Sequence, residues 1–151
     1  MVSVSYRTFV QGELIVITNA DITIYNYYIG SDRLPVYLET QIKGVNWYTK
    51  QEVDVDNGLK SADNYKIRIP VDAYTQRKEY IDPERFKALS LDEAKQYWTI
   101  DNGDYFVKGL HGPVQKESEI RQNNLCGKVV SWSDNRRGSL CMQHFRLGGV
   151  R

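Results

Sequence analysis

Hydrophobic and polar residues alternate with a period of two along much of the first 70 residues, a pattern typical of strands that are buried on one face. Such runs occupy residues 14–18, 22–27, 36–42, 45–48 and 65–70. We expect a turn at residues 19–21 between the first two strands. A bulge or bend is expected at Gly44, because a glycine interrupts the strand pattern there. Pro70 ends the last of these strands or marks a sheet edge.

The pattern changes at about residues 82–97, where two helix starts follow one another. Asp82 is a suitable N-cap with Pro83 in the first turn, and Ser90 with Glu93 three residues later forms a capping box. Each predicted helix carries a narrow apolar stripe that can pack on a sheet, made of Phe86 and Leu89 in the first and of Leu91, Ala94 and Tyr97 in the second.

Two hairpins are expected in the last third of the chain. Asn-Gly at residues 102–103 favours a type I′ turn between strands at 98–100 and 104–108. The polar run DNRRG lies between strands at 129–133 and 140–147, whereas residues 110–127 have no regular pattern. We therefore predict one mainly β domain over residues 1–151, a small antiparallel barrel or sandwich with a short helical insertion and an extended segment at residues 1–12.

Composition indicates a folded domain and gives little support for independent nucleic-acid binding. Charged residues make up 26% and hydrophobic residues 41% of the chain, which are ordinary globular values, and the net charge is +1. Residues 101–151 are mildly basic, whereas neutralising phosphates takes many Lys and Arg side chains. The longest apolar run, residues 14–17, is too short for a membrane span or a signal peptide. We expect a reducing cytoplasm, no membrane contact, and free thiols at Cys126 and Cys141.

The sequence offers few groups for catalysis or metal binding. It contains no H-E-x-x-H or C-x-x-C motif and no phosphate-binding glycine motif. Cys141 and His144 could form a dyad only across a bulge, because a three-residue spacing places strand side chains on opposite faces. Asp54 and Asp56 resemble the start of a calcium loop. The pattern then needs an oxygen ligand, a glycine and a final glutamate, but those positions hold Gly58, Leu59 and Tyr65. We expect no enzymatic activity, no cofactor and no metal.

Polar turns are the candidate contact sites. They comprise Asp134, Asn135, Arg136 and Arg137 in the last hairpin, and Asp54, Asp56 and Asn57 in an earlier turn-rich segment. Arginine is enriched at protein interfaces, which favours a role in partner contact. A different interpretation gives Trp47, Trp98 and Trp132 an exposed role in stacking on single-stranded nucleic acid, although aromatic residues at strand spacing are more often core.

The segments ADITIYNYY, QIKGVNWY, GLKSADNYKIRIP, DNGDYFVKG and VVSWSDNRRGSLCMQHFRLGG follow one another along the chain. Their succession is similar to that of small proteins encoded among the head and tail structural genes of tailed bacteriophages and prophages of Gram-positive hosts. The resemblance covers residues 20–149. Its most specific pieces are IKGV followed by Trp47, the run at residues 61–70, and DNRRGS with the later MQH.

The resemblance implies a structural role in the virion, with assembly in the cytoplasm of the bacterial host. We expect a neck component, such as a head-closure or connector ring, that contacts copies of itself and portal, adaptor or tail proteins. The basic last third of the chain could contact packaged DNA weakly. A tail terminator, a tail-completion protein or a capsid decoration protein are alternatives of the same class. A nucleic-acid-binding β-barrel and an enzyme using Cys141 and His144 are alternatives of other classes.

Overall fold

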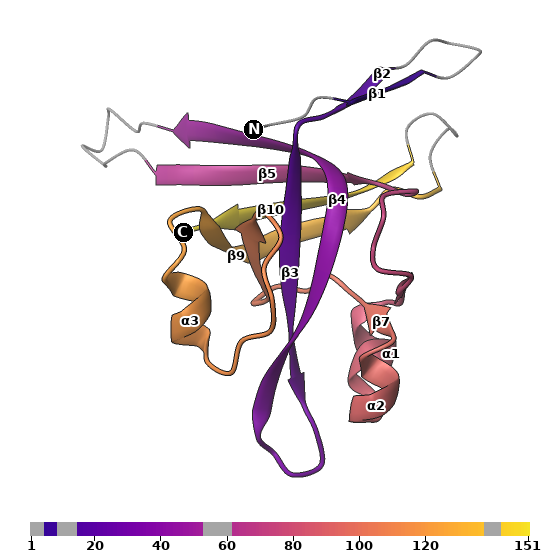
Figure 1. The fold of residues 1–151 in the computed structure, drawn as a ribbon, viewed down its shortest axis with the longest axis vertical. Helices are drawn as coiled ribbons and strands as arrows, with labels where there is room; N and C mark the ends of the chain where they lie inside the picture. Colours follow the sequence, from indigo (N-terminus) through magenta and orange to yellow (C-terminus); the bar gives the residue numbers. More distant parts are fainter. Residues whose placement is uncertain (1–4, 9–14, 53–61, 138–142) are drawn as a thin grey trace.

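The computed structural model describes residues 5–8, 15–52, 62–137 and 143–151. Six antiparallel strands close into a barrel in the order β10-β5-β4-β3-β8-β9 (Figure 1). These strands are β3 (Ala20–Ile29), β4 (Pro35–Glu52), β5 (Ala62–Pro70), β8 (Tyr105–Lys108), β9 (Cys126–Asp134) and β10 (His144–Val150). The predicted mainly β fold with a short helical insertion is confirmed.

Alternation along the strands fills the barrel. The interior is lined by fully buried side chains that the period-two pattern directs inward, among them Ile22, Ile24, Ile42, Ile67, Ile69, Phe106 and Leu147. Trp47 and Trp98 belong to this core, and Trp132 packs against it while half-buried. The tryptophans therefore do not form the exposed stacking platform considered above.

The bulge expected at Gly44 is confirmed. The predicted strands at 36–42 and 45–48 form a single long strand, β4, in which Ala20 pairs with Val45 and Asp21 pairs with Lys43. Gly44 is the extra residue between them, with φ of 85°. The resulting bend lets the first half of β4 pair with β3 and its second half pair with β5 (Figure 1).

The prediction of a turn at residues 19–21 is wrong. Strand β2 (Ile15–Thr18) pairs with β1 (Ser5–Thr8), which lies within the predicted extended segment, and the chain continues through Asn19 into β3. The Asn19 side-chain amide donates to Trp47 O at 3.0 Å and its Oδ1 accepts from Trp47 N at 2.8 Å. These bonds to β4 keep the chain extended where the local sequence favours a reversal.

The hairpin expected around Asn102 and Gly103 is also wrong. Strand β7 (Tyr97–Trp98) pairs in parallel with β6 (Glu79–Tyr80) and not with β8. A turn is present, since Asp104 N donates to Asp101 O at 3.1 Å, but of the two central residues Gly103 alone has a positive φ, so the turn is not type I′. Buried bonds from Asp104 to β3 hold this turn against the barrel.

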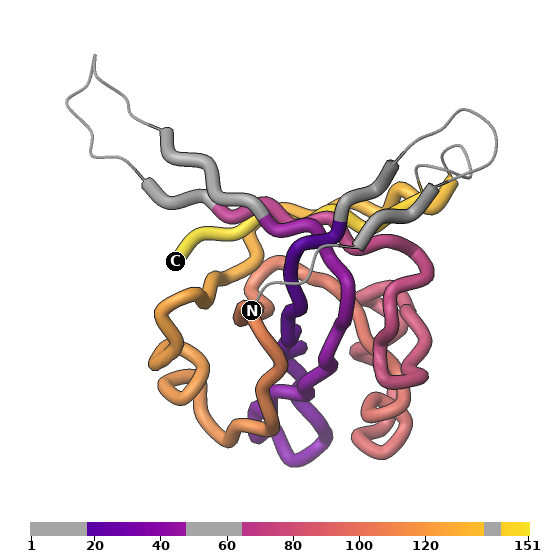
Figure 2. Tube along the Cα trace, turned by 45° about the horizontal axis from the view of Figure 1, so that its top comes forward, coloured from indigo at the N-terminus to yellow at the C-terminus, as the bar shows by residue number. Residues whose placement is uncertain are grey.

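Three short helices flank the hairpin formed by β3 and β4. Helices α1 (Pro83–Lys87) and α2 (Leu91–Ala94) begin at the predicted caps, but α2 ends before Tyr97, which starts β7. Helix α3 (Glu117–Arg121) was not predicted, and it lies on the other side of the hairpin (Figure 2). None of the helices in the described parts of the chain is long and apolar enough to cross a membrane.

The last hairpin is formed by β9 and β10, and its first strand is longer than predicted. Asn135 N donates to His144 O at 3.0 Å where the two strands separate. Cys126 is buried with a free thiol, as expected. Cys141 lies outside the described residues, so the suggested dyad with His144 stays a prediction.

Candidate functional site

A cleft of about 340 Å³ lies beside the barrel, between the segment that follows β5 and the adjoining ends of β9 and β10. We call it the Arg136 cleft. Its apolar lining residues are Pro70, Val71, Ala73, Tyr80, Trp98 and Phe145, and its polar ones are Thr75, Lys78, Glu79 and Arg136. Trp98 and Phe145 are each 3% exposed, and polar groups make up more than half of the surface that lines the cleft. A hollow that combines aromatic side chains with a few charged groups can bind a partner.

Three aromatic rings form the floor of the Arg136 cleft. The parallel pairing of β6 and β7 places Tyr80 opposite Trp98, with ring centroids 5.0 Å apart. Phe145, near the start of β10, lies 4.3 Å from Tyr80 and 5.2 Å from Trp98. Edge-to-face and tilted contacts of this kind hold the rings in fixed positions.

Arg136 is held above this floor by charge and by ring contacts. Its Nε donates to Asp134 Oδ1 at 2.9 Å and its Nη2 donates to Asp134 Oδ2 at 2.7 Å. The guanidinium carbon lies 4.9 Å from the Tyr80 ring centroid and 5.1 Å from that of Phe145. The bonds from Arg136 lower the pKa of the Asp134 carboxyl, so the pair is ionised at neutral pH. The cleft therefore presents an arginine that is already oriented for a partner.

The other predicted site residues have different positions. Arg137 is exposed, and with Asp134 and Arg136 it lines an adjoining hollow of about 460 Å³. Asn135 has a structural role, because its Nδ2 donates to Ser133 Oγ at 3.0 Å within the turn. Asp54, Asp56 and Asn57 lie outside the described residues.

The polar groups of the cleft are suited to binding more than to proton transfer. The Tyr80 hydroxyl is buried, and burial together with Asp134 raises its pKa to about 12, against the opposite effect of the Thr99 hydroxyl. Lys78 Nζ donates to Glu39 O and, at 3.2 Å, to Thr40 Oγ1, which fastens this side of the cleft to β4. Burial lowers the pKa of Lys78, although Glu39 opposes the shift.

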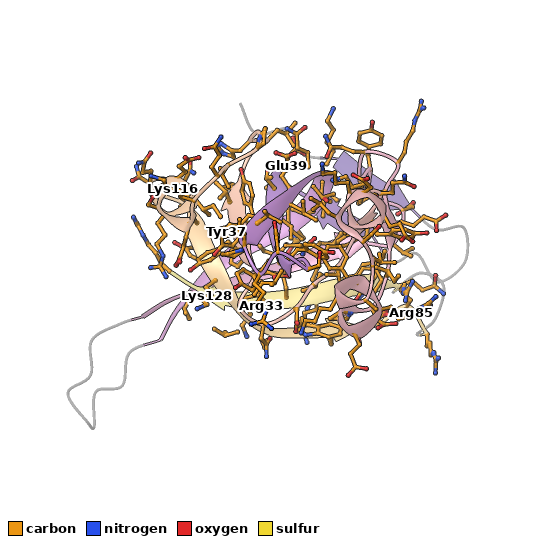
Figure 3. The ribbon with its side chains drawn as sticks, turned by 90° about the horizontal axis from the view of Figure 1, so that it is seen from below. Arg33, Tyr37, Glu39, Arg85, Lys116 and Lys128 are labelled. Atoms are coloured by element: carbon orange, nitrogen blue, oxygen red, sulfur yellow. The ribbon has the colours of Figure 1, made fainter. Side chains whose placement is uncertain are left out.

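A second aromatic surface runs along the outer face of the β3–β4 hairpin. Tyr27 and Tyr37 lie 5.7 Å apart and Tyr37 lies 6.0 Å from Tyr105, measured between ring centroids. Arg121 and Lys128 both lie over the Tyr105 ring, at 5.4 and 6.0 Å from its centroid. Figure 3 shows Lys128 on the same side of the molecule as Tyr37. Tyr105 itself is buried, so of these three tyrosine rings only those of Tyr27 and Tyr37 are accessible on this surface.

Arg136 and Asp134 were predicted as site residues, whereas the aromatic floor was not. Tyr80 and Trp98 belong to two-residue strands that give no period-two signal. Phe145 lies within the predicted strand at residues 140–147, to which no site was assigned. Sequence spacing cannot bring residues 80, 98, 136 and 145 together, because their contact depends on the closure of the barrel and on the pairing of β6 with β7.

Comparison with known proteins places the chain in a family. Residues 17–150 match the family of unknown function DUF6751. The chain belongs to this family. The matched region contains all six barrel strands and every lining residue of the Arg136 cleft named above. No curated protein and no solved structure matches the chain. Among the described residues, no three His, Cys, Asp or Glu side chains are grouped as a metal site.

Proposed function

We propose that the chain is a structural protein of a tailed phage particle and that it acts by protein–protein contact in a ring at the neck. The observation that carries the proposal is the Arg136 cleft, in which an oriented arginine covers a floor of tyrosine, tryptophan and phenylalanine. Arginine, tyrosine and tryptophan are the residues that most often dominate the binding energy of protein interfaces. The resemblance to proteins of phage head and tail gene clusters supports the location.

Exposed apolar side chains support contact with neighbouring proteins. Tyr27, Ile29, Leu34, Val71, Tyr74, Leu91, Leu110, Leu125 and Val130 are all large and exposed. Three of them, Tyr27, Ile29 and Leu34, lie on the β3–β4 hairpin or its turn. Grouped exposed apolar residues are typical of interaction surfaces.

Weak contact with packaged DNA is a secondary part of the proposal. Arg121, Lys128 and Arg151 line a hollow of about 130 Å³ next to Tyr105. Glu117 neutralises part of this charge, since Arg121 Nε donates to its Oε1 at 2.9 Å. The remaining positive charge is small for one copy and would act through the number of copies in a ring.

The proposal is tested by the copy number of the chain in purified particles, measured by quantitative mass spectrometry against the portal and major capsid proteins. One copy per portal subunit, or half that number, supports a neck or tail-end ring. A copy number equal to that of the capsid or tail-tube protein would assign the chain to decoration or to the tube. Absence from the particles would refute the structural role and leave nucleic-acid binding, tested by its dependence on salt, as the alternative.

A further inference from the structure

The tip of the β3–β4 hairpin projects from the barrel and carries two exposed apolar side chains. Strand β8 pairs with β3 only as far as Tyr25, so four further residues of β3 carry the turn about 13 Å beyond that pairing, at the usual strand rise. Ile29 is 47% exposed and Leu34 is 64% exposed at this tip. Figure 1 shows the hairpin extending past helices α1 and α2.

Two local hydrogen bonds stabilise the turn at the tip. Arg33 N donates to Gly30 O at 3.0 Å, and Leu34 N donates to Asp32 Oδ1 at 3.1 Å. Arg33 has φ of 61°, which is uncommon for a residue other than glycine. Strained backbone positions of this kind are concentrated at functional sites. A turn ordered by such bonds loses less conformational freedom on binding, which favours insertion into a partner.

We infer that Leu34 at the tip of one copy inserts into the Arg136 cleft of a neighbouring copy. This inference rests on the proposed function, because it requires the chain to assemble with itself. The cleft of about 340 Å³ exceeds the roughly 150 Å³ of an apolar cavity that accepts a benzene ring, so it has room for a leucine side chain. Arg136 lies over the floor, so the apolar surface open to the tip is the wall formed by Val71 and Ala73, of which Val71 is 45% exposed.

Charges around the two surfaces are complementary. The tip carries one residue of each sign, Asp32 and Arg33 (Figure 3), beside Leu34. The cleft and its adjoining hollow carry the exposed cation Arg137 and the exposed anion Glu79 on their rims. With Leu34 inserted, Asp32 can meet Arg137 while Arg33 meets Glu79. Matching of both signs fixes the orientation of the tip in the cleft.

The contact has to join two different copies. Figures 1 and 2 both show the hairpin tip well away from the end of β9, which Arg136 follows by two residues. One copy therefore cannot fill its own cleft. Two different surfaces meet in this contact, so it is head-to-tail, and repetition about a closed axis produces a ring.

The inference is tested by disulfide cross-linking in assembled particles. One variant carries Leu34→Cys and Ala73→Cys, so that one thiol is at the tip and the other is in the cleft. The matched control carries Leu110→Cys with Ala73→Cys, since Leu110 is exposed on a different surface. Cys141→Ser is included in both. Oxidation should join a large fraction of the first variant into dimers and longer species that reducing agent dissolves, and should leave the control monomeric.

Failure of the inference is distinguishable from failure of the proposed function. Equal cross-linking of the two variants, in particles that hold the chain at ring copy number, would overturn the insertion and leave the structural role intact. Particles of the unmodified phage that lack the chain would refute both.

A second pair of variants covers the case in which the cysteine variants do not enter particles. Leu34→Asp should reduce incorporation at least tenfold with an unchanged circular dichroism spectrum, whereas Leu110→Asp should be incorporated normally. Equal incorporation of these two variants would overturn the inference.

Discussion

Asp104 should make the folded chain less stable as the pH rises from about 4 to about 7. Its side chain is 3% exposed, between β3 and the turn before β8. It accepts hydrogen bonds from Asn26 Nδ2 at 2.8 Å, from Tyr27 N at 3.0 Å and from Asp101 N at 3.1 Å. These three donors favour the carboxylate, but burial outweighs them and raises the pKa of Asp104 to about 7.

The size of the effect follows from the difference between the folded and unfolded pKa. In the unfolded chain the Asp104 carboxyl has its ordinary pKa of 3.8, so its pKa in the folded chain is about 3 units higher. Each unit corresponds to about 1.4 kcal/mol, which makes the contribution about 4 kcal/mol. Between the two pKa values the folded chain holds a proton that the unfolded chain has released. The stabilisation of the folded chain by protonated Asp104 is therefore fully present below about pH 3.8, and it is lost as the pH rises through about 7.

The assay is urea unfolding of the wild type and of Asp104→Asn at intervals from pH 4 to pH 8. Other titrating groups cancel in the difference between the two chains. The free energy of unfolding of the wild type, relative to the variant, should fall by about 4 kcal/mol over this range. Asp92→Asn, at an exposed position in α2, is the matched control for the loss of one carboxylate. A constant or rising difference for Asp104→Asn would refute the reasoning, because it would mean that the three donors keep the carboxyl ionised.

Three further substitutions test the packing of the barrel and of the cleft. Gly149→Ala should lower the free energy of unfolding by about 1–3 kcal/mol, because the added Cβ would overlap the Phe106 ring. Wild-type stability of the variant would contradict this close approach. Gly103→Val should lower the free energy of unfolding by about 1–3 kcal/mol, because valine resists the φ of 96° at this position. Gly112→Val is the control and should cost less, since Gly112 has equally open space and no positive φ. Equal costs would show that backbone strain is not the cause. Arg136→Ala should cost about 1 kcal/mol in the same unfolding assay through its lost ring and ion-pair contacts, and an unchanged stability would mean that the arginine is not held over the floor.

Local signals in the sequence predict much of the fold. Asp82 and Ser90 cap their helices because each side chain accepts from a backbone N–H three residues later, which is a purely local arrangement. Gly44 marks the bulge in β4, and the alternation in residues 65–70 places Ile67 and Ile69 in the core. These features depend on neighbours within a few residues.

The incorrect predictions share a physical cause, which is that distant hydrogen bonds override local turn preference. Asn19 is a turn former that bonds to Trp47, and the turn at Asn102 is shaped by the bonds of Asp104 to β3. Helix α3 escapes prediction because Ile120 is its one buried residue and Lys116 provides no side-chain cap. The aromatic floor of the Arg136 cleft could not be predicted for a similar reason, since its rings come from three strands that are distant in sequence.

Cryo-electron microscopy of purified particles, with a reconstruction focused on the neck, tests the central claim most directly. The account predicts a ring in which each subunit is a six-stranded barrel, with the β3–β4 tip of one copy in the Arg136 cleft of the next. A neck whose density is filled by other proteins, with this barrel absent from the particle, would contradict it.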